Sequence, residues 1–228
     1  HSCLRRVTVD IAGRLPTAEE AEVFLASPDE QKRAKWIDHL LASTDYATFF
    51  ANKWGAILRN KRRNDNDKVA TFGLHDWIRN SFHQNKPYDQ FVREIITATG
   101  SPADTPAVGW YREVKDQAAQ VEATAQLFLG LRIQCARCHH HPVEKWSQQD
   151  YYGMAAFFSR VGRKKSSIPN YDRVFHNRGV AEATNPKSGD KVKPTGLDAE
   201  PLVLDQDDDP RVKLADWMSQ PDNGFFSQ

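Results

Sequence analysis

The sequence predicts a mainly α-helical protein, a multi-helix orthogonal bundle with a small irregular or β-containing C-terminal extension. Three observations lead to this prediction. Apolar residues recur at helical spacing over residues 1–161, and helix-start signals repeat along the same part of the chain. From residue 162 to residue 208 the helical period stops, and Pro, Gly, Asn, Lys and Asp become frequent. We therefore expect a helical domain to end near residue 161 and an irregular excursion to end near residue 208.

Length and composition narrow the range of functions. The chain has 228 residues, which suits one domain or one and a half. Its 31 basic and 30 acidic residues leave a net charge of +1, so no global field attracts nucleic acid or an anionic membrane surface. No run approaches the ~20 apolar residues that a membrane-spanning helix needs. Three cysteines are too few for a disulfide scaffold.

The first helices are marked by their starting residues. Residues 1–13 are basic and apolar, and their conformation stays open. Thr17 and Glu20 form a capping box that predicts a short helix through Leu25. A second capping box over residues 27–30 has proline at the first helical position and predicts another helix. The residues expected on the buried face of that helix are Ala34, Ile37, Leu40 and Leu41.

Helical spacing continues through the middle of the chain. It predicts helices from Asp45, over residues 71–83, from Pro87 and over residues 114–129. The charged run at residues 61–68 mixes acids with bases and lacks aromatic residues, which favours a solvated loop over a nucleic-acid surface. Ser147 and the residues after it predict a further helix that carries Met154. Short alternating pieces predict strands, and Asp209-Pro210 predicts a last helix to Met218. These strand candidates are residues 171–175, 189–193 and 201–204.

The most informative stretch is Gln134 to Trp146, which reads Q-C-A-R-C-H-H-H-P-V-E-K-W. Cys135, Cys138 and His139 form a complete C-x-x-C-H, the attachment signature of c-type haem. Two thiols one turn apart can reach the two vinyl groups on one edge of the porphyrin, and the following histidine can be the proximal iron ligand. The motif therefore predicts haem c as the cofactor.

Two other kinds of site use the same cysteines. A structural zinc could be bound by the two thiolates with His139, His141 or a distant histidine, although a second half-site is missing from the sequence. A metal-free redox dithiol would be expected to follow a strand and open a helix, and that context is absent here. Haem is therefore preferred, with zinc as the alternative.

The run from Cys135 to Phe158 resembles the centre of a planctomycete-type cytochrome c-like domain of unknown function. Further stretches fit the same family over about residues 4–161, including residues 13–17, 85–94 and 128–130. His141 matches the second histidine of the family's C-H-x-H-P pattern, which implies a role as ligand or as partner of a ligand. The end of the chain, residues 209–228, resembles the start of a second uncharacterised domain that usually follows.

The sixth iron position has several candidates. Met154 stands on the apolar face of the helix after the motif, and a thioether is a common ligand in electron carriers. His75 and His83 lie on an earlier predicted helix and could supply an imidazole instead. An open position is the third possibility. Glu144 could hold the N–H of a ligating imidazole in the outer shell.

These residues predict an extracytoplasmic domain that serves electron transfer, because haem attachment takes place outside the cytoplasm. We expect a periplasmic or similar location, with a redox partner protein or a following domain of the same chain as partner. Other catalytic motifs are missing, including G-x-S-x-G and H-E-x-x-H, so enzyme activity is left open. The alternatives are a zinc-stabilised interaction module and a haem enzyme domain within a larger degradative protein.

Overall fold

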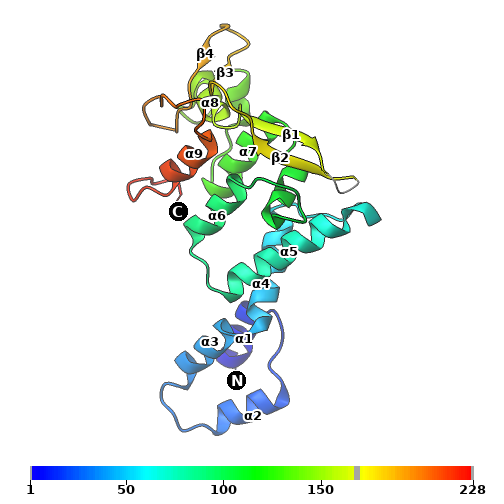
Figure 1. Cartoon of the computed structure of the whole chain (residues 1–228). Coiled ribbons are helices and arrows are strands. Elements are labelled where there is room, and N and C mark those ends of the chain that lie inside the picture. The colour runs from blue at the N-terminus through cyan, green and yellow to red at the C-terminus, as the bar shows by residue number, and fades with distance from the viewer. Residues whose placement is uncertain (1, 167–169, 227–228) are drawn as a thin grey trace. The chain divides into compact units, whose positions relative to one another are not determined.

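The computed structural model describes residues 2–166 and 170–226 and is mainly helical, which confirms the predicted fold class (Figure 1). These residues form nine α-helices, three short 3-10 segments and, between α8 and α9, two small two-stranded antiparallel sheets. The α-helices are α1 Ser2–Ala12, α2 Ala18–Ala26, α3 Lys32–Leu41, α4 Thr44–Ile57, α5 Lys68–His83, α6 Tyr88–Ile96, α7 Gln117–Phe128, α8 Gln148–Ala156 and α9 Pro210–Met218. The 3-10 segments are η1 Asp65–Asp67, η2 Pro106–Arg112 and η3 Gln134–Arg137. The strands are β1 Val161–Lys165, β2 Asp172–His176, β3 Ala183–Thr184 and β4 Lys191–Val192.

Contacts between residues divide the chain into two compact units. The first unit contains residues 1–61 and 74–86, and the second contains residues 62–73 and 87–228. This grouping does not test the boundaries predicted at residues 161 and 208, which stay predictions. Among the described residues, no helix is both long and apolar enough to cross a membrane.

The first unit packs α1, α3 and α4 together. Residues 1–13, whose conformation the sequence left open, contribute α1, and Leu4 and Leu40 are almost fully buried. The capping box at Thr17 is confirmed at the start of α2. The box predicted at Ser27 is wrong, because α3 begins at Lys32 without a side-chain cap. The Ser27 hydroxyl instead accepts a hydrogen bond from the Asp29 backbone and closes a turn. Of the residues expected to be buried on α3, only Leu40 is.

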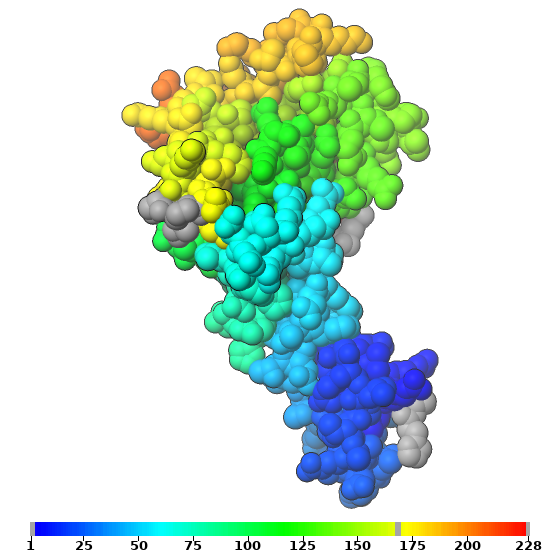
Figure 2. All heavy atoms as spheres, turned by 90° about the vertical axis from the view of Figure 1, so that its right-hand side faces the viewer, coloured from blue at the N-terminus to red at the C-terminus, as the bar shows by residue number. Residues whose placement is uncertain are grey.

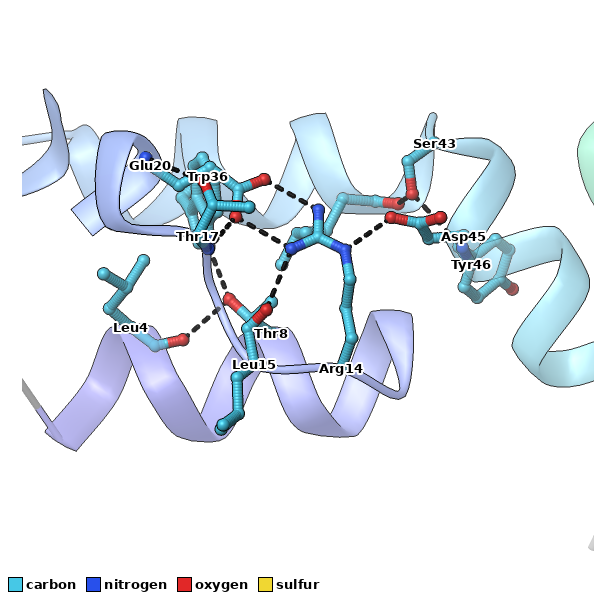
Figure 3. A network of polar contacts seen from close by, with 11 residues as sticks. Leu4, Thr8, Arg14, Leu15, Thr17, Glu20, Trp36, Ser43, Asp45 and Tyr46 are labelled. Carbon is cyan, nitrogen blue, oxygen red and sulfur yellow. Dashed lines mark hydrogen bonds and ion pairs between the residues drawn. The ribbon is translucent and has the colours of Figure 1, made fainter.

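An arginine joins three parts of the first unit (Figure 3). The Arg14 guanidinium donates two hydrogen bonds to the Glu20 carboxylate, at 2.8 and 2.7 Å, and one to Asp45 at 2.6 Å. Glu20 also accepts from the Thr17 backbone N–H at 2.7 Å. Such two-pronged charge-assisted contacts are stronger than neutral hydrogen bonds and fix direction. Arg14 therefore ties the starts of α2 and α4 to the loop after α1.

The second unit has an aromatic core. Trp110, Tyr111 and Phe128 are buried where η2 and α7 meet, and α7 packs against α8. The helix predicted to begin after Pro87 is α6, and four of its residues are buried. These are Phe91, Val92, Ile95 and Ile96. The segment around Trp110 forms the 3-10 helix η2.

The hairpin of β1 and β2 is fastened to the helical part of the second unit. Val174 of β2 pairs with Gly100, and the Arg163 guanidinium of β1 donates to the backbone carbonyls of Tyr111, Val114 and Lys115. Figure 2 shows the hairpin in yellow beside the green segment around residue 110. The strand predicted at residues 171–175 is confirmed as β2 with a shift of one residue. The predicted strand at residues 189–193 shrinks to β4, and that at residues 201–204 is wrong, because those residues form an irregular segment.

Helix α9 is held to the same unit by a buried arginine. Asp209 caps the helix, as predicted, and its carboxylate binds the Arg211 guanidinium at 2.6 Å. The Arg211 side chain is 1% exposed and also donates to the Ala98 carbonyl and the Tyr111 hydroxyl, both at 3.0 Å. Burial raises the pKa of Tyr111, so its hydroxyl stays protonated and donates to the Ile96 carbonyl. The helix that resembles the start of a following domain thus packs on α6.

The Arg14 network predicts acid-dependent stability in the first unit. The Arg14 guanidinium lowers the pKa of Glu20 to about 2, below its unfolded value of ~4.3. A lowered folded pKa contributes stability above the unfolded value, and this stability is lost as pH falls toward the folded one. Urea unfolding should therefore show that Glu20→Gln is less stable than wild type at neutral pH. The gap should close between about pH 5 and pH 2. Glu19→Gln is the matched control, since Glu19 is exposed on the same turn, and an equal pH-dependent gap there would contradict the prediction.

The buried Arg211 predicts a large stability loss on substitution. Arg211→Met leaves the Asp209 carboxylate without its guanidinium and the Ala98 carbonyl and Tyr111 hydroxyl without their donor. Removing one partner of a buried ion pair costs about 3–5 kcal/mol. The free energy of unfolding from urea denaturation should fall by that order. Lys213→Met, at an exposed position of the same helix, serves as control. A loss as small as that of the control would show that the contacts of Arg211 do not stabilise α9.

Candidate functional site

The C-x-x-C-H motif lies on a surface turn of the second unit. Cys135 is in η3, and Cys138 closes that segment, with its backbone N–H donating to the Cys135 carbonyl at 3.2 Å. The His139 N–H reaches the same carbonyl at 3.3 Å. Ala136 is buried between the cysteines, whereas both thiols are exposed. The turn therefore presents two free thiols and the following histidine to solvent from one hydrogen-bonded loop.

Neighbouring elements fix the position of this turn. Helix α7 ends at Phe128, and Gly130, two residues later, has a φ of 68° that allows the chain to turn away before the motif. Helix α8 then returns beside η3. Gln148 and Tyr152 of α8 both donate to the Arg137 carbonyl, at 3.0 and 3.4 Å. The capping box that starts α8, with Ser147 and Asp150, is confirmed.

The ring of His139 is oriented by a backbone carbonyl. Its Nδ1 lies 2.6 Å from the His140 carbonyl oxygen. A carbonyl only accepts hydrogen bonds, so in the neutral ring Nδ1 carries the proton and Nε2 keeps its lone pair. This is the arrangement that proteins use to prepare an imidazole for binding a metal through Nε2. The His139 side chain is exposed, so that lone pair faces solvent-accessible space.

His141 has the opposite tautomer. Its Nδ1 accepts hydrogen bonds from the Glu144 backbone N–H at 2.9 Å and from the Val143 N–H at 3.3 Å. Nε2 must then carry the proton of the neutral ring. The His141 backbone N–H also donates to the Trp146 carbonyl at 2.8 Å and closes the loop. His141 thus has a structural role in the loop, and its predicted role toward a metal stays a prediction.

Glu144 contacts His141 through its backbone and not through its carboxylate. The sequence suggested that the carboxylate could hold an imidazole N–H, but Nδ1 of His141 already faces the Glu144 N–H. The Glu144 residue is exposed. In the structure the residue that orients a candidate ligand is His140, through its backbone carbonyl.

The described residues contain no group of three or more His, Cys, Asp or Glu arranged to hold a metal ion. The zinc site considered from the sequence would need four ligands brought together around one point. Cys135, Cys138 and the nearby histidines are close in sequence, but their side chains do not form such a cluster.

Met154 lies on another face of α8 from the residues that contact the motif. It is fully buried in the core. Tyr152 touches the Arg137 carbonyl, and two residues along an α-helix correspond to a rotation of about 200°. Met154 therefore points away from the side of α8 that faces η3. The structure does not bring Met154 and His139 together, and the sixth-ligand role stays a prediction.

The histidines considered as other sixth ligands belong to the first unit. His75 Nε2 lies 3.1 Å from the Asn52 side-chain oxygen, and His83 is exposed near the end of α5. The motif belongs to the second unit. Cys3, the third cysteine, lies half-buried in α1 of the first unit.

Two residues beside the motif were missed by sequence reasoning. Trp146 is 4% exposed, and no described residue pairs with its indole N–H. Lys145 donates to both carboxylate oxygens of Asp198 at 2.6 Å. Trp146 stands inside the motif run, where its size could have marked it as an anchor. Asp198 lies 53 residues away in sequence, and no local signal indicates the pair.

A known family model matches most of the chain. Residues 1–163 match the family PSCyt2, described as a protein of unknown function (DUF1549). The chain belongs to this family. The match spans the motif turn and confirms the resemblance to a planctomycete cytochrome-like domain of unknown function. No curated protein and no solved structure matches the chain.

The two histidine tautomers can be tested directly. At a pH where both rings are neutral, nitrogen-15 NMR of the protein without haem should show the proton of His139 on Nδ1 and that of His141 on Nε2. The reason is that a carbonyl faces the first nitrogen and backbone N–H groups face the second. His140 supplies the control, since no hydrogen bond joins its ring to another of the described residues, and its nitrogens should show a mixture. The same tautomer at His139 and His141 would contradict the geometry.

Proposed function

We propose that this domain carries haem c, attached through the thiols of Cys135 and Cys138 with His139 as the proximal ligand, and that it transfers electrons outside the cytoplasm. The observation that carries the proposal is the pairing of two exposed thiols with an imidazole whose Nε2 lone pair is free. Membership of a family named cytochrome-like supports it. The location follows from the proposal, because covalent haem attachment takes place outside the cytoplasm.

The residues at the turn fit a covalently attached haem. Thioether bonds need thiols that the porphyrin edge can reach, and both cysteines are exposed. The proximal position needs a neutral imidazole with a fixed ring, which the His140 carbonyl supplies at His139. When bound, haem supplies a one-electron iron couple. The protein itself has to hold the His139 ring in position, and the packing of η3 against α8 supports the turn that carries it.

An exposed site suits electron exchange with a partner. The chain from Cys138 to His140 is exposed, and Val143, two residues after His141, is 87% exposed. We infer that the partner is a redox protein or a following domain of the same chain that approaches this turn. Two apolar residues in the loop, Pro142 and Val143, offer surface for a short-lived contact.

Covalent attachment is tested by expression together with a haem-attachment system. Wild-type protein should stain for haem after denaturing electrophoresis, and Cys135→Ser with Cys138→Ser should abolish the stain. Cys3→Ser is the control and should keep it, since Cys3 lies on α1 and outside the motif. A colourless wild-type protein that contains zinc would instead support the zinc-stabilised module.

The same expression tests the proximal ligand. His139→Ala should keep part of the covalent haem, because both thiols remain, but its visible spectrum should change. His140→Ala is the matched control, because His140 orients His139 through its backbone carbonyl, which alanine retains. Identical spectra for wild type and His139→Ala would remove His139 from the iron.

A further inference from the structure

A second candidate binding site lies at the C-terminal end of α9. A cavity of about 510 Å³ is lined by the segment at residues 197–199, the end of α9 and the turn that follows it. This volume is in the range of small-molecule sites, ~300–1,000 Å³. Its side chains include Leu197, Asp198, Trp217, Gln220, Asp222 and Phe225.

The cavity is negatively polarised. Two carboxylates line it, from Asp198 and Asp222, and no lysine, arginine or histidine does. The C-terminal end of α9 adds to this, because the end of a helix carries a partial negative charge. Among the described residues no ion pair involves Asp222, which is exposed. Asp198 is already paired with the Lys145 ammonium, so the carboxylate left to attract a ligand with positive charge is that of Asp222.

The aromatic walls favour the same kind of ligand. Gly196 packs closely against the Trp217 ring, where an added Cβ would come within 2.4 Å of a ring atom. Phe225 provides a second ring. Aromatic faces attract cations through their quadrupole, most strongly when the cation is a weakly hydrated ammonium.

The protein already holds an ammonium group in this way at the edge of the cavity. The Lys145 Nζ lies 2.6 Å from both oxygens of Asp198 and 5.0 Å from the centre of the Trp146 ring. The Trp146 ring in turn meets the edge of Phe225, with ring centres 5.8 Å apart. One carboxylate and one indole therefore bind an ammonium beside the cavity, and Asp222 and Trp217 contribute the same two kinds of group to its lining.

We propose that this cavity binds a small organic cation of the quaternary or alkyl ammonium class, held between the Asp222 carboxylate and the rings of Trp217 and Phe225. This site is separate from the proposed haem site, although the loop from Pro142 to Trp146 joins them through Lys145 and Trp146.

The test uses choline as the probe and the whole chain as the protein. Its neutral isostere, 3,3-dimethyl-1-butanol, has the same shape without the charge. In proton–nitrogen NMR, choline should shift the Trp217 indole signal, identified by its loss in Trp217→Phe, in a saturable way. The neutral alcohol should bind much more weakly. Equal binding of the two compounds, or no saturable shift with choline, would overturn the proposal.

Substitutions then test whether the Asp222 carboxylate and the Phe225 ring bind choline. Asp222→Asn should weaken choline binding about fivefold, as expected for one exposed charge pair. Asp205→Asn, which removes the same charge from an exposed position outside the cavity, should leave it unchanged. Phe225→Leu keeps an apolar side chain but removes the ring, and should weaken choline more than the alcohol. Equal losses of choline affinity in Asp222→Asn and Asp205→Asn would show that choline responds only to the overall charge of the protein, which would overturn the proposal. The haem proposal rests on Cys135, Cys138 and His139, which do not line the cavity. A protein that fails to bind choline could therefore still carry covalent haem.

Discussion

A guanidinium inside a protein must satisfy its charge and its donors without water, and Arg211 does so by reaching three parts of the second unit at once. Its partners are the carboxylate at the start of its own helix, a carbonyl after α6 and the hydroxyl of Tyr111 in η2. Breaking any of these contacts would leave a buried polar group unpaired, which is costly. The relative positions of α6, η2 and α9 therefore depend on one side chain.

The proposed haem site depends on a smaller constraint, the protonation of two histidines two residues apart. Nδ1 of His139 faces a carbonyl, which leaves the Nε2 lone pair of the neutral ring free. Nδ1 of His141 instead accepts from two backbone N–H groups and closes the loop. The sequence H-H-H contains no difference between these positions. The backbone around them creates it, so only His139 has Nδ1 facing a hydrogen-bond acceptor.

Local signals predicted most helices because their causes are local. The capping boxes at Thr17 and Ser147 act within four residues, and the structure confirms both. Ser27 failed because its hydroxyl was free to close a turn instead, a competition that sequence spacing cannot settle. The motif residues were also found from sequence, since the C-x-x-C-H spacing is itself the signal. The pairing of Lys145 with Asp198 joins segments 53 residues apart, so it could not be predicted. The orientation of His139 depends on the backbone conformation at His140, which the run of three histidines does not specify.

The hairpin of β1 and β2 bears on where this domain can be cut. The family match ends at residue 163, and Arg163 is the residue whose guanidinium covers three carbonyls at the end of η2. A fragment trimmed to the matched residues would keep that side chain but lose β2, the strand that pairs with β1 and with Gly100. It would also lose Arg211 and leave the Tyr111 hydroxyl and the Ala98 carbonyl without their donor. The shortest piece that keeps its own contacts is thus longer than the piece by which the family is recognised.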